Sequence, residues 1–298
     1  MKSLVRPLPI AYAGEPGAFA EDAVIAAFGE VERAPVAGFR EVFEVVTRGE
    51  AAAGVVPIEN LVNGSVREVY DLLLEHDLGI TGEVVVPVDL ALAALPGVVI
   101  DDIERVYSHI QALGQAERFL RSRRWNLLTT YNTAGAGRLV AEQGDRAAAA
   151  VLSPRAGARF GLTLLTGSIQ DVPDNRTRFH VVSRERPEPH SGGNGAGGFR
   201  TTLAFGVRNE PGTLLEALGV FAARSINMSK LESRPSRAAA WEYVFWADLD
   251  AGAGDPSCAA AITELAAVAT MVRVFGSYER ATEPLIAAAS VAADVDSV

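Results

Sequence analysis

At 298 residues, the chain is long enough for about two domains of ordinary size. Apolar residues make up 49 % of it and charged residues 21 %, which excludes an intrinsically disordered or collagen-like chain. The formal net charge of -10 argues against a nucleic-acid-binding surface, so an anionic substrate must meet a locally placed cation. The single cysteine, Cys258, excludes an internal disulfide and fits a reducing cytoplasm. No Cys or His cluster has the spacing of a metal site.

No segment of the sequence is typical of a membrane helix. The longest apolar stretch, residues 84–100, contains Asp89 and two prolines, whereas a span needs about 20 nearly uncharged residues. Near the N-terminus, two prolines interrupt a stretch already too short for the core of a signal peptide. We therefore expect a first strand at residues 9–13.

The first 183 residues alternate short apolar runs with amphipathic helical patterns, which is typical of α/β folds. Strands are predicted at residues 10–13, 54–57, 90–94, 105–107, 127–131, 148–152 and 179–183. Helices are predicted at residues 19–28, 66–75, 112–121 and 133–142. Because these elements exceed what one simple sheet needs, we expect two α/β lobes with a cleft between them.

The composition changes sharply after this region. Two prolines and five glycines fall within residues 186–198, a composition that buries little surface and behaves as a flexible connector. We therefore place a linker at residues 186–199, between a first domain at residues 1–185 and a second at residues 200–282. The Ala-rich tail, residues 283–298, is expected to be disordered.

The second domain has the pattern of a small regulatory unit. Strands are predicted at residues 202–207, 226–232, 241–249 and 272–278, and helices at residues 211–224 and 257–267. Pro211 stands where a helix opens. The order βαββαβ predicts a ferredoxin-like fold.

Two segments follow predicted strands and open helices in the first domain. Residues 14–19 contain two glycines, which either form a structural turn or present free N–H groups to an anion; the segment lacks the dinucleotide and P-loop patterns. Farther on, Glu59 and Asn60 end a buried strand and Ser65 precedes a helix. Such positions face the ligand crevice of open α/β sheets. Alternatively, Ser65 is a helix cap and Glu59 a solvated charge.

Two further polar segments have both a functional and a structural interpretation. His109 has the chemistry of a general base, but we favour a structural role for it, with Ser108 as a helix cap. No Ser-His-Asp triad is expected, because a GxSxG elbow is absent. Residues 171–179 offer Thr177 as a hydrogen-bond donor and Arg178 as a carboxylate clamp. Their alternative interpretation is an ordinary solvated loop.

Taken together, these segments resemble prephenate dehydratase with a C-terminal ACT regulatory domain, from about residue 10 to residue 278. The Gly-rich loop of that family is similar to residues 14–19, and its Pro-Ile-Glu-Asn motif to residues 57–60. Four further motifs match, namely Ser-His-Pro-Gln, Thr-Arg-Phe after an Asp and an Asn, and the Asn-x-Pro-Gly-Ala-Leu and Glu-Ser-Arg-Pro of ACT domains. The Asn-x-Pro-Gly-Ala-Leu motif is matched by Asn209, Pro211, Gly212 and Leu214. The other matching residues are Ser108, His109, Gln111, Asp171, Asn175, Thr177, Arg178, Phe179 and, in the second domain, residues 232–235.

The resemblance implies a two-lobed, periplasmic-binding-protein-like catalytic domain followed by a ferredoxin-like ACT domain. It implies conversion of prephenate to phenylpyruvate, water and carbon dioxide in phenylalanine biosynthesis, without a metal or redox cofactor. Thr177 would donate to the leaving hydroxyl, and Glu59 or water would supply the proton. Arg178 would clamp a carboxylate, although strand alternation points it away from Thr177. The substrate-binding residues would be Asn60, Gly64, Ser65, Ser108, Gln111, Thr133, Arg178 and Phe179.

The resemblance also implies that L-phenylalanine binds between ACT domains of neighbouring subunits and regulates the enzyme, which would be a homodimer or homotetramer. The implied effector site comprises Asn209, Pro211, Gly212, Thr213, Leu214, Asn227, Glu232, Ser233, Arg234 and Pro235. No nucleic-acid or membrane partner is expected.

Four positions depart from the family pattern, namely Leu61, Ile110, Asn132 and Thr213, where Ser, Pro, Ser and Ala are usual. Loss of the two hydroxyls keeps arogenate, the amino analogue, open as substrate. Leu61 and Asn132 also keep open a prephenate decarboxylase that leaves the ring non-aromatic, whereas the intact Thr177 disfavours it. A non-catalytic amino-acid sensor is a third alternative.

Overall fold

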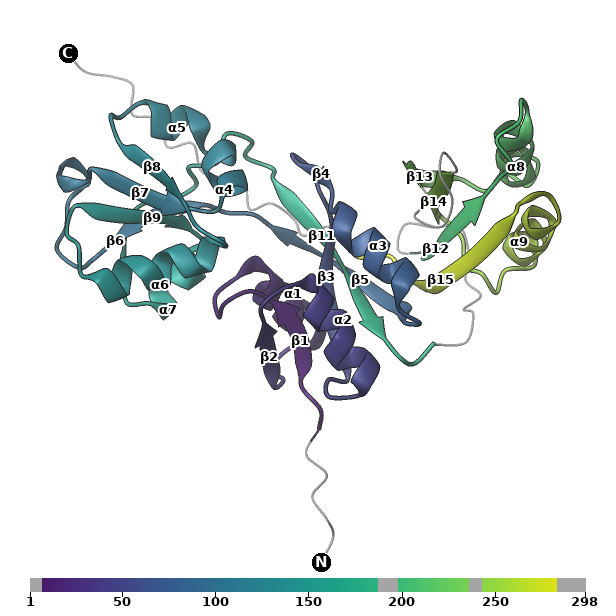
Figure 1. Cartoon of the computed structure of the whole chain (residues 1–298), viewed down its shortest axis with the longest axis horizontal. Coiled ribbons are helices and arrows are strands. Elements are labelled where there is room, and N and C mark those ends of the chain that lie inside the picture. The colour runs from purple at the N-terminus through teal and green to yellow at the C-terminus, as the bar shows by residue number, and fades with distance from the viewer. Residues whose placement is uncertain (1–6, 187–197, 236–242, 283–298) are drawn as a thin grey trace, which may run out of the picture.

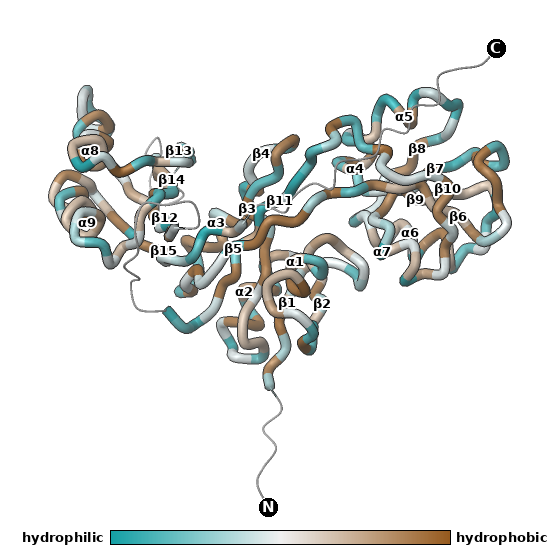
Figure 2. Tube along the Cα trace, turned by 180° about the vertical axis from the view of Figure 1, so that it is seen from behind, coloured by the Kyte–Doolittle hydropathy of each residue, from teal (hydrophilic) through white to brown (hydrophobic). Residues whose placement is uncertain are grey.

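The computed structural model describes residues 7–186, 198–235 and 243–282. Three β-sheets with flanking helices follow one another along the long axis of the molecule (Figure 1). Two of them form the lobes of the N-terminal part and the third forms the C-terminal part. The predicted fold class, two α/β lobes followed by a ferredoxin-like unit, is confirmed. Hydrophobic residues concentrate along the central strands of the lobes (Figure 2).

The first lobe, at the centre of Figure 1, has a sheet of order β2-β1-β3-β11-β5, with β4 paired to β3. Strand β1 runs parallel to β2 and β3, whereas β11 lies antiparallel between β3 and β5. Successive residues of β3 face opposite sides, so Val55 packs with α1 and Val56 with α2 and α3. The elements are β1 Ile10–Ala13, α1 Phe19–Phe28, β2 Arg33–Val36, α2 Phe39–Arg48, β3 Ala53–Asn60, β4 Gly64–Ser65, α3 Arg67–Glu75, β5 Gly79–Pro87 and β11 Arg176–Ser183.

The second lobe is inserted between β5 and β11, so the chain crosses from one lobe to the other twice. Its sheet has the order β10-β6-β9-β7-β8, in which β7 runs parallel to both β8 and β9. The elements are β6 Ala91–Ala94, the 3-10 helix Ile100–Asp102, β7 Arg105–Ser108, α4 Ile110–Gln115, α5 Glu117–Arg121, β8 Asn126–Thr129, α6 Thr133–Gln143, β9 Ala148–Leu152, α7 Pro154–Arg159 and β10 Thr163–Thr166.

The C-terminal part is an antiparallel sheet of order β13-β14-β12-β15, with α8 and α9 packed on one face. Its elements are β12 Phe199–Gly206, α8 Thr213–Ala222, β13 Met228–Pro235, β14 Tyr243–Leu249, α9 Pro256–Val268 and β15 Met271–Glu279. The predicted βαββαβ order is therefore confirmed.

The other face of the C-terminal sheet packs on the first lobe and shares its core. Trp246 stacks on Phe275 and meets the ring of Tyr70, on α3, edge-on at 4.9 Å. Where β15 crosses β5, a Cβ atom at Gly276 would lie 1.9 Å from the carbonyl oxygen of Ile80, so only glycine permits this approach. The two domains therefore share one hydrophobic core and a close backbone contact at this interface.

Several elements were not predicted, namely β2, α2, β4, β5, α7 and β10. The single helix predicted at residues 112–121 is wrong, because the chain forms α4 and α5 with a break at Ala116. Strand β11 begins at Arg176, three residues before the predicted start. Most of the predicted linker and all of the predicted tail lie outside the described residues. No helix in the described part of the chain has the length and apolar content that crossing a bilayer requires.

His180 of β11 lies at the interface between the domains and is 1 % exposed. Its Nε2 atom is 3.2 Å from the hydroxyl of Tyr278, which lies 2.6 Å from the Thr202 hydroxyl. Burial, helped by the charge of Arg178, lowers the pKa of His180 to about 3. The folded protein therefore keeps this imidazole neutral at physiological pH.

A depressed pKa makes folding stability depend on pH. The unfolded chain binds a proton at His180 near pH 6.5 and the folded chain does not, so stability falls as the pH drops below 6.5. We expect His180 to contribute a loss of about 1.4 kcal/mol between pH 7.5 and 5.5. Urea unfolding at both pH values should show a smaller loss for His180→Gln. An equal loss in parent and variant would contradict this assignment.

Candidate active site

A cleft of about 660 Å³ lies between the two lobes. Its walls are formed by the loops after β1, β2, β3, β7 and β8, and by the start of β11. This volume lies within the range of pockets that bind small organic ligands. The predicted site residues that line it are Asn60, Gly64, Ser65, Gln111, Thr133, Thr177 and Phe179.

The hydroxyl of Thr177 is held by Asn60, which stands opposite it on β3. Asn60 Nδ2 donates to Thr177 Oγ1 at 3.0 Å and to Asn175 Oδ1 at 2.8 Å. Asn60 Oδ1 accepts the backbone N–H groups of Val62 and Asn63, so its amide orientation is fixed. Because the Thr177 oxygen accepts from Asn60, its own proton is available to an acceptor in the cleft.

The starts of five helices also line the cleft. In open α/β sheets, helices that follow strands begin at the crevice edge, and their first N–H groups have no partner within the helix. These groups and the helix dipoles favour negative charge. Arg67, the first residue of α3, is the single Arg or Lys among the described lining residues, and Glu68 the single Asp or Glu. The other helix starts are residues 18–19 of α1, 38–39 of α2, 109–111 of α4 and 132–134 of α6.

On the second lobe, Gln111 and Gln115 reach the cleft from α4. Gln115 Nε2 is 3.4 Å from Asn60 Oδ1, so this side chain connects the two lobes at the site. His109 caps α4, since its Nδ1 atom accepts the backbone N–H of Gln111 at 3.3 Å. Burial lowers the pKa of His109, which favours the neutral ring that this acceptor role requires.

Two predicted roles of serines are corrected by the structure. Ser108 is fully buried and donates to the backbone oxygen of Val151 at 2.6 Å, so it neither caps α4 nor reaches the cleft. Ser65 does line the cleft, but it does not cap α3, because its hydroxyl donates to Glu232 of the C-terminal domain. Ser65 therefore connects the rim of the cleft with β13.

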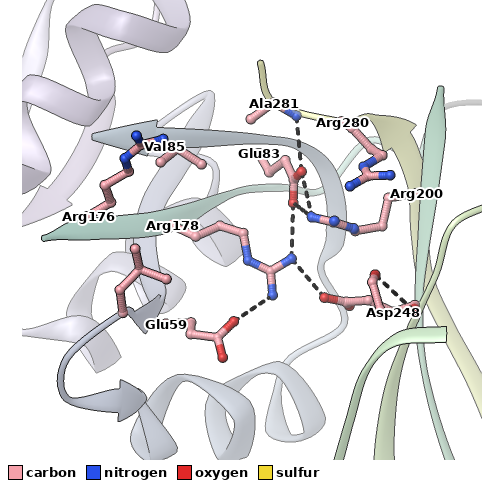
Figure 3. A pocket seen from close by; sticks show the side chains of 11 residues that line it. Glu59, Glu83, Val85, Arg176, Arg178, Arg200, Asp248, Arg280 and Ala281 are labelled. Atoms are coloured by element: carbon pink, nitrogen blue, oxygen red, sulfur yellow. Dashed lines mark hydrogen bonds and ion pairs between the residues drawn. The ribbon is translucent and has the colours of Figure 1, made fainter. Parts of the chain in front are cut away.

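Glu59 and Arg178 are absent from the described lining of the cleft and instead line a cavity that faces the C-terminal domain (Figure 3). Strand alternation explains this, because Asn60 and Thr177 occupy the cleft side and their neighbours point the other way. Arg178 lies 3.0 Å from Glu59 and 2.8 Å from Asp248 of β14. This corrects the predictions that Arg178 clamps a substrate carboxylate and that Glu59 supplies the proton.

The positions that depart from the family pattern leave the cleft intact. Leu61 and Ile110 are 65 % and 62 % exposed, and neither lines the cleft. Asn132 caps α6, because its Oδ1 atom accepts the backbone N–H of Gly135 at 2.5 Å. Serine is an equally good cap, so this exchange preserves the start of the helix.

Sequence reasoning missed a polar contact across the cleft. The Tyr131 hydroxyl of the second lobe donates to Glu15 of the first lobe at 2.5 Å, and Arg138 donates to the same hydroxyl at 2.9 Å. The one signal in the sequence for this contact is the position of Tyr131, directly before the start of a helix. Asn175 was noted within the signature alone, yet it is 2 % exposed and holds Asn60.

The predicted effector residues fall on two separate parts of the C-terminal domain. The first group surrounds the start of α8, where Gly212 precedes the helix with a φ of 92° and the Thr213 hydroxyl donates to Arg208 O. The second group lies on β13, where Glu232 and Arg234 point to Ser65 and Asp71 of the first lobe. Among the described residues, no hydrogen bond joins the two groups within one chain. Asn227 donates to Asp250 at 2.6 Å.

The described residues were also compared with the ligand sets that bind metal ions. Within the described ranges, no three His, Cys, Asp or Glu side chains converge as metal ligands. The cleft itself offers amides, hydroxyls and backbone N–H groups, which suit the binding of an oxygen-rich anion.

Comparison with known proteins identifies the family. Residues 10–187 match the sequence model of prephenate dehydratase, and residues 201–267 match that of the ACT domain. Arogenate dehydratase/prephenate dehydratase 2 of Arabidopsis thaliana is 40 % identical over 278 residues, which cover 90 % of this chain and 72 % of that protein. The bifunctional chorismate mutase/prephenate dehydratase of Aquifex aeolicus is 36 % identical, and the match covers 94 % and 75 % of the two chains.

Solved structures give the same result for the fold. Prephenate dehydratase from Arthrobacter aurescens in complex with L-Phe matches with a TM-score of 0.83 and 32 % identity, over 91 % of this chain and 90 % of that one. GqqA, described as a novel type of quorum quenching acylase, matches with a TM-score of 0.82 and 31 % identity, over 91 % and 97 %. The chain therefore belongs to the prephenate dehydratase family and carries a C-terminal ACT domain.

Proposed function

We propose that this enzyme converts prephenate to phenylpyruvate, carbon dioxide and water in the synthesis of phenylalanine. The observation that carries the proposal is the Thr177 hydroxyl, which Asn60 holds so that its proton is available to a ligand in the cleft. Membership of the prephenate dehydratase family supports the reaction class. We keep the catalytic domain at residues 1–185 and the ACT domain at residues 200–282 as proposed boundaries.

The chemistry requires little more than orientation and one proton. The bond between the ring and its carboxylate breaks, its electron pair enters the ring, and the ring hydroxyl leaves as water after taking up a proton. Thr177 stabilises the leaving oxygen by a hydrogen bond, because a hydroxyl group of its acidity does not give up its proton. Glu59 points away from the cleft, so we assign the proton to water.

We propose prephenate rather than arogenate as the substrate, because the cleft lining offers many hydrogen-bond donors and one carboxylate. Prephenate carries two carboxylates and a keto group, which accept hydrogen bonds from helix N-termini, Gln111, Gln115 and Arg67. The amino group of arogenate needs an acceptor, and Glu68 is the one carboxylate among the described lining residues. Leu61 lies outside the cleft lining and Asn132 caps α6 as a serine would, so neither exchange by itself favours the decarboxylase alternative.

We also propose that L-phenylalanine regulates the enzyme through the ACT domain of a homodimer or homotetramer. The two groups of predicted effector residues lie apart within one chain, which suits a site completed by a second copy. The Arthrobacter aurescens relative was solved with L-Phe bound. We further propose a cytoplasmic location, which suits the buried, unpaired thiol of Cys258.

The catalytic proposal predicts the behaviour of Thr177→Ala. Removing one transition-state donor typically lowers the rate by about 10²–10³, whereas the lost hydrogen bond to Asn60 costs about 1 kcal/mol of stability. We expect kcat for phenylpyruvate formation to fall by that factor with little change in melting temperature. Thr177→Ser, which keeps the donor, should retain appreciable activity.

Mass spectrometry of the products, with prephenate and arogenate offered separately, identifies the reaction. Phenylpyruvate from prephenate supports the proposal, and faster conversion of arogenate to phenylalanine would overturn the substrate assignment. A product that keeps the ring hydroxyl would show a decarboxylase. Parental activity in Thr177→Ala would refute the assigned role of this hydroxyl.

The regulatory proposal predicts binding and assembly together. Calorimetry on the full-length protein should detect L-phenylalanine, with D-phenylalanine as a control ligand that binds at least tenfold more weakly. Light scattering at micromolar concentration should give at least twice the mass of one chain, because each effector site needs two copies. A monomer in both the presence and the absence of L-phenylalanine would contradict the shared site.

A further inference from the structure

The two cleft side chains that carry the reaction each have a charged neighbour on the opposite face of the sheet. On β11, Thr177 faces the cleft and Arg178 faces the ACT domain; on β3, Asn60 faces the cleft and Glu59 faces the ACT domain. The two charged neighbours form an ion pair at 3.0 Å. They line a cavity of about 230 Å³ between the domains (Figure 3).

Arg178 contacts carboxylates from three different strands. Its guanidinium lies 2.8 Å from Asp248 of the ACT strand β14, 3.0 Å from Glu59 of β3 and 3.3 Å from Glu83 of β5. The Asp248 and Glu83 side chains are 3 % and 2 % exposed, so these charges are removed from water. Removing one partner of a buried pair leaves the other uncompensated, which makes such contacts sensitive to small displacements.

The ACT domain supplies cations as well as a carboxylate. Lys230 of β13 lies 3.1 Å from Glu59, and Arg200 of β12 lies 2.7 Å from Glu83. Three cations (Arg178, Arg200, Lys230) therefore balance three anions (Glu59, Glu83, Asp248), with members from both domains. We call these six residues the interdomain charge network.

The pKa values of Arg178 and Asp248 agree with an ion pair between these two groups. Burial lowers the pKa of Arg178, but Asp248 and Glu83 outweigh it and hold this pKa above its ordinary value. Burial likewise raises the pKa of Asp248, but Arg178, together with neighbouring groups such as the Thr202 hydroxyl and Arg200, outweighs burial, so that the net shift is downward. Both groups are therefore charged near neutral pH.

We propose that Glu59 and Arg178 are positioning residues, through which Lys230 and Asp248 of the ACT domain set the placement of Asn60 and Thr177 in the cleft. The proposal rests on the proposed dehydratase function. Adjacent residues on a strand share a peptide plane, so a change in the Arg178–Asp248 contact that displaces the Arg178 backbone also displaces the Thr177 backbone. An effector that displaces β13 or β14 changes the reaction rate by this route.

The interface also offers a contact that this mechanism does not use. Arg273 of β15 donates to the backbone oxygens of Leu74 and His76, at 3.0 and 2.6 Å, near the end of α3. It has no contact with the interdomain charge network among the described interactions. Arg273→Gln is therefore a matched control that weakens the same domain interface elsewhere.

The test compares Asp248→Asn and Lys230→Gln with Arg273→Gln in the full-length protein. Initial rates of phenylpyruvate formation from prephenate give kcat and KM, and thermal melts show that each variant is folded. We expect kcat to fall at least fivefold in both network variants, with KM within twofold of the wild-type value. Arg273→Gln should keep kcat within twofold. Lys230→Arg, which retains the charge, should restore most of the rate.

The outcomes separate this proposal from the function on which it rests. A wild-type enzyme that forms no phenylpyruvate would overturn the proposed function and this proposal with it. An active wild-type enzyme with unchanged kcat in both network variants would overturn the positioning role alone, as would an equal loss in Arg273→Gln. If Asp248→Asn does not fold, Lys230→Gln and its rescue by Lys230→Arg decide between these results.

Discussion

Strand β11 carries different chemistry on its two faces, and the rest of the molecule depends on that alternation. Thr177 and Phe179 face the cleft, whereas Arg178 and His180 face the ACT domain. The strand pairs on both sides, so its residues are fixed by two ladders of backbone hydrogen bonds. The side chains on both faces therefore share one firmly held backbone. Gly276 adds to this by allowing β15 to cross β5 at backbone contact.

A chain with a net charge of -10 needs local groups that favour negative charge if it is to bind a dianion such as prephenate. An arginine clamp was the expected solution, and Arg178 was its candidate. In the structure, Arg178 lies between the domains, where it pairs with Asp248. The groups in the cleft that favour negative charge are the N-termini of helices and Arg67. Backbone N–H groups favour carboxylates without a counter-charge that itself has to be desolvated.

The sequence predicted much of the fold and the centre of the site. The motif containing Asn60 and the signature containing Thr177 lie together on neighbouring strands, and alternation correctly indicated that Arg178 points away from Thr177. The roles of Glu59 and Ser108 could not be predicted in this way. Glu59 forms an ion pair with Lys230 of the ACT domain, and the Ser108 hydroxyl donates to a backbone oxygen of β9. Both contacts join segments far apart in the chain, which local pattern does not reveal.

The missed elements have similar causes. Strand β5 overlaps the long apolar stretch only at residues 84–87, and its pattern is neither helical nor strictly alternating, because β5 pairs with β11 on one side and is crossed by β15. The exposed Tyr131 reaches Glu15 only because two lobes close over one cleft. Such contacts depend on how distant segments are arranged in three dimensions, which local sequence patterns do not reveal.

In the proposed mechanism, the ACT domain acts on the cleft through β11. Hydrogen–deuterium exchange of the full-length enzyme, with and without saturating L-phenylalanine, tests it most directly. We expect the effector to change amide exchange at residues 176–183 as well as within the ACT domain. Changes confined to residues 199–279, accompanied by a change in activity, would contradict it.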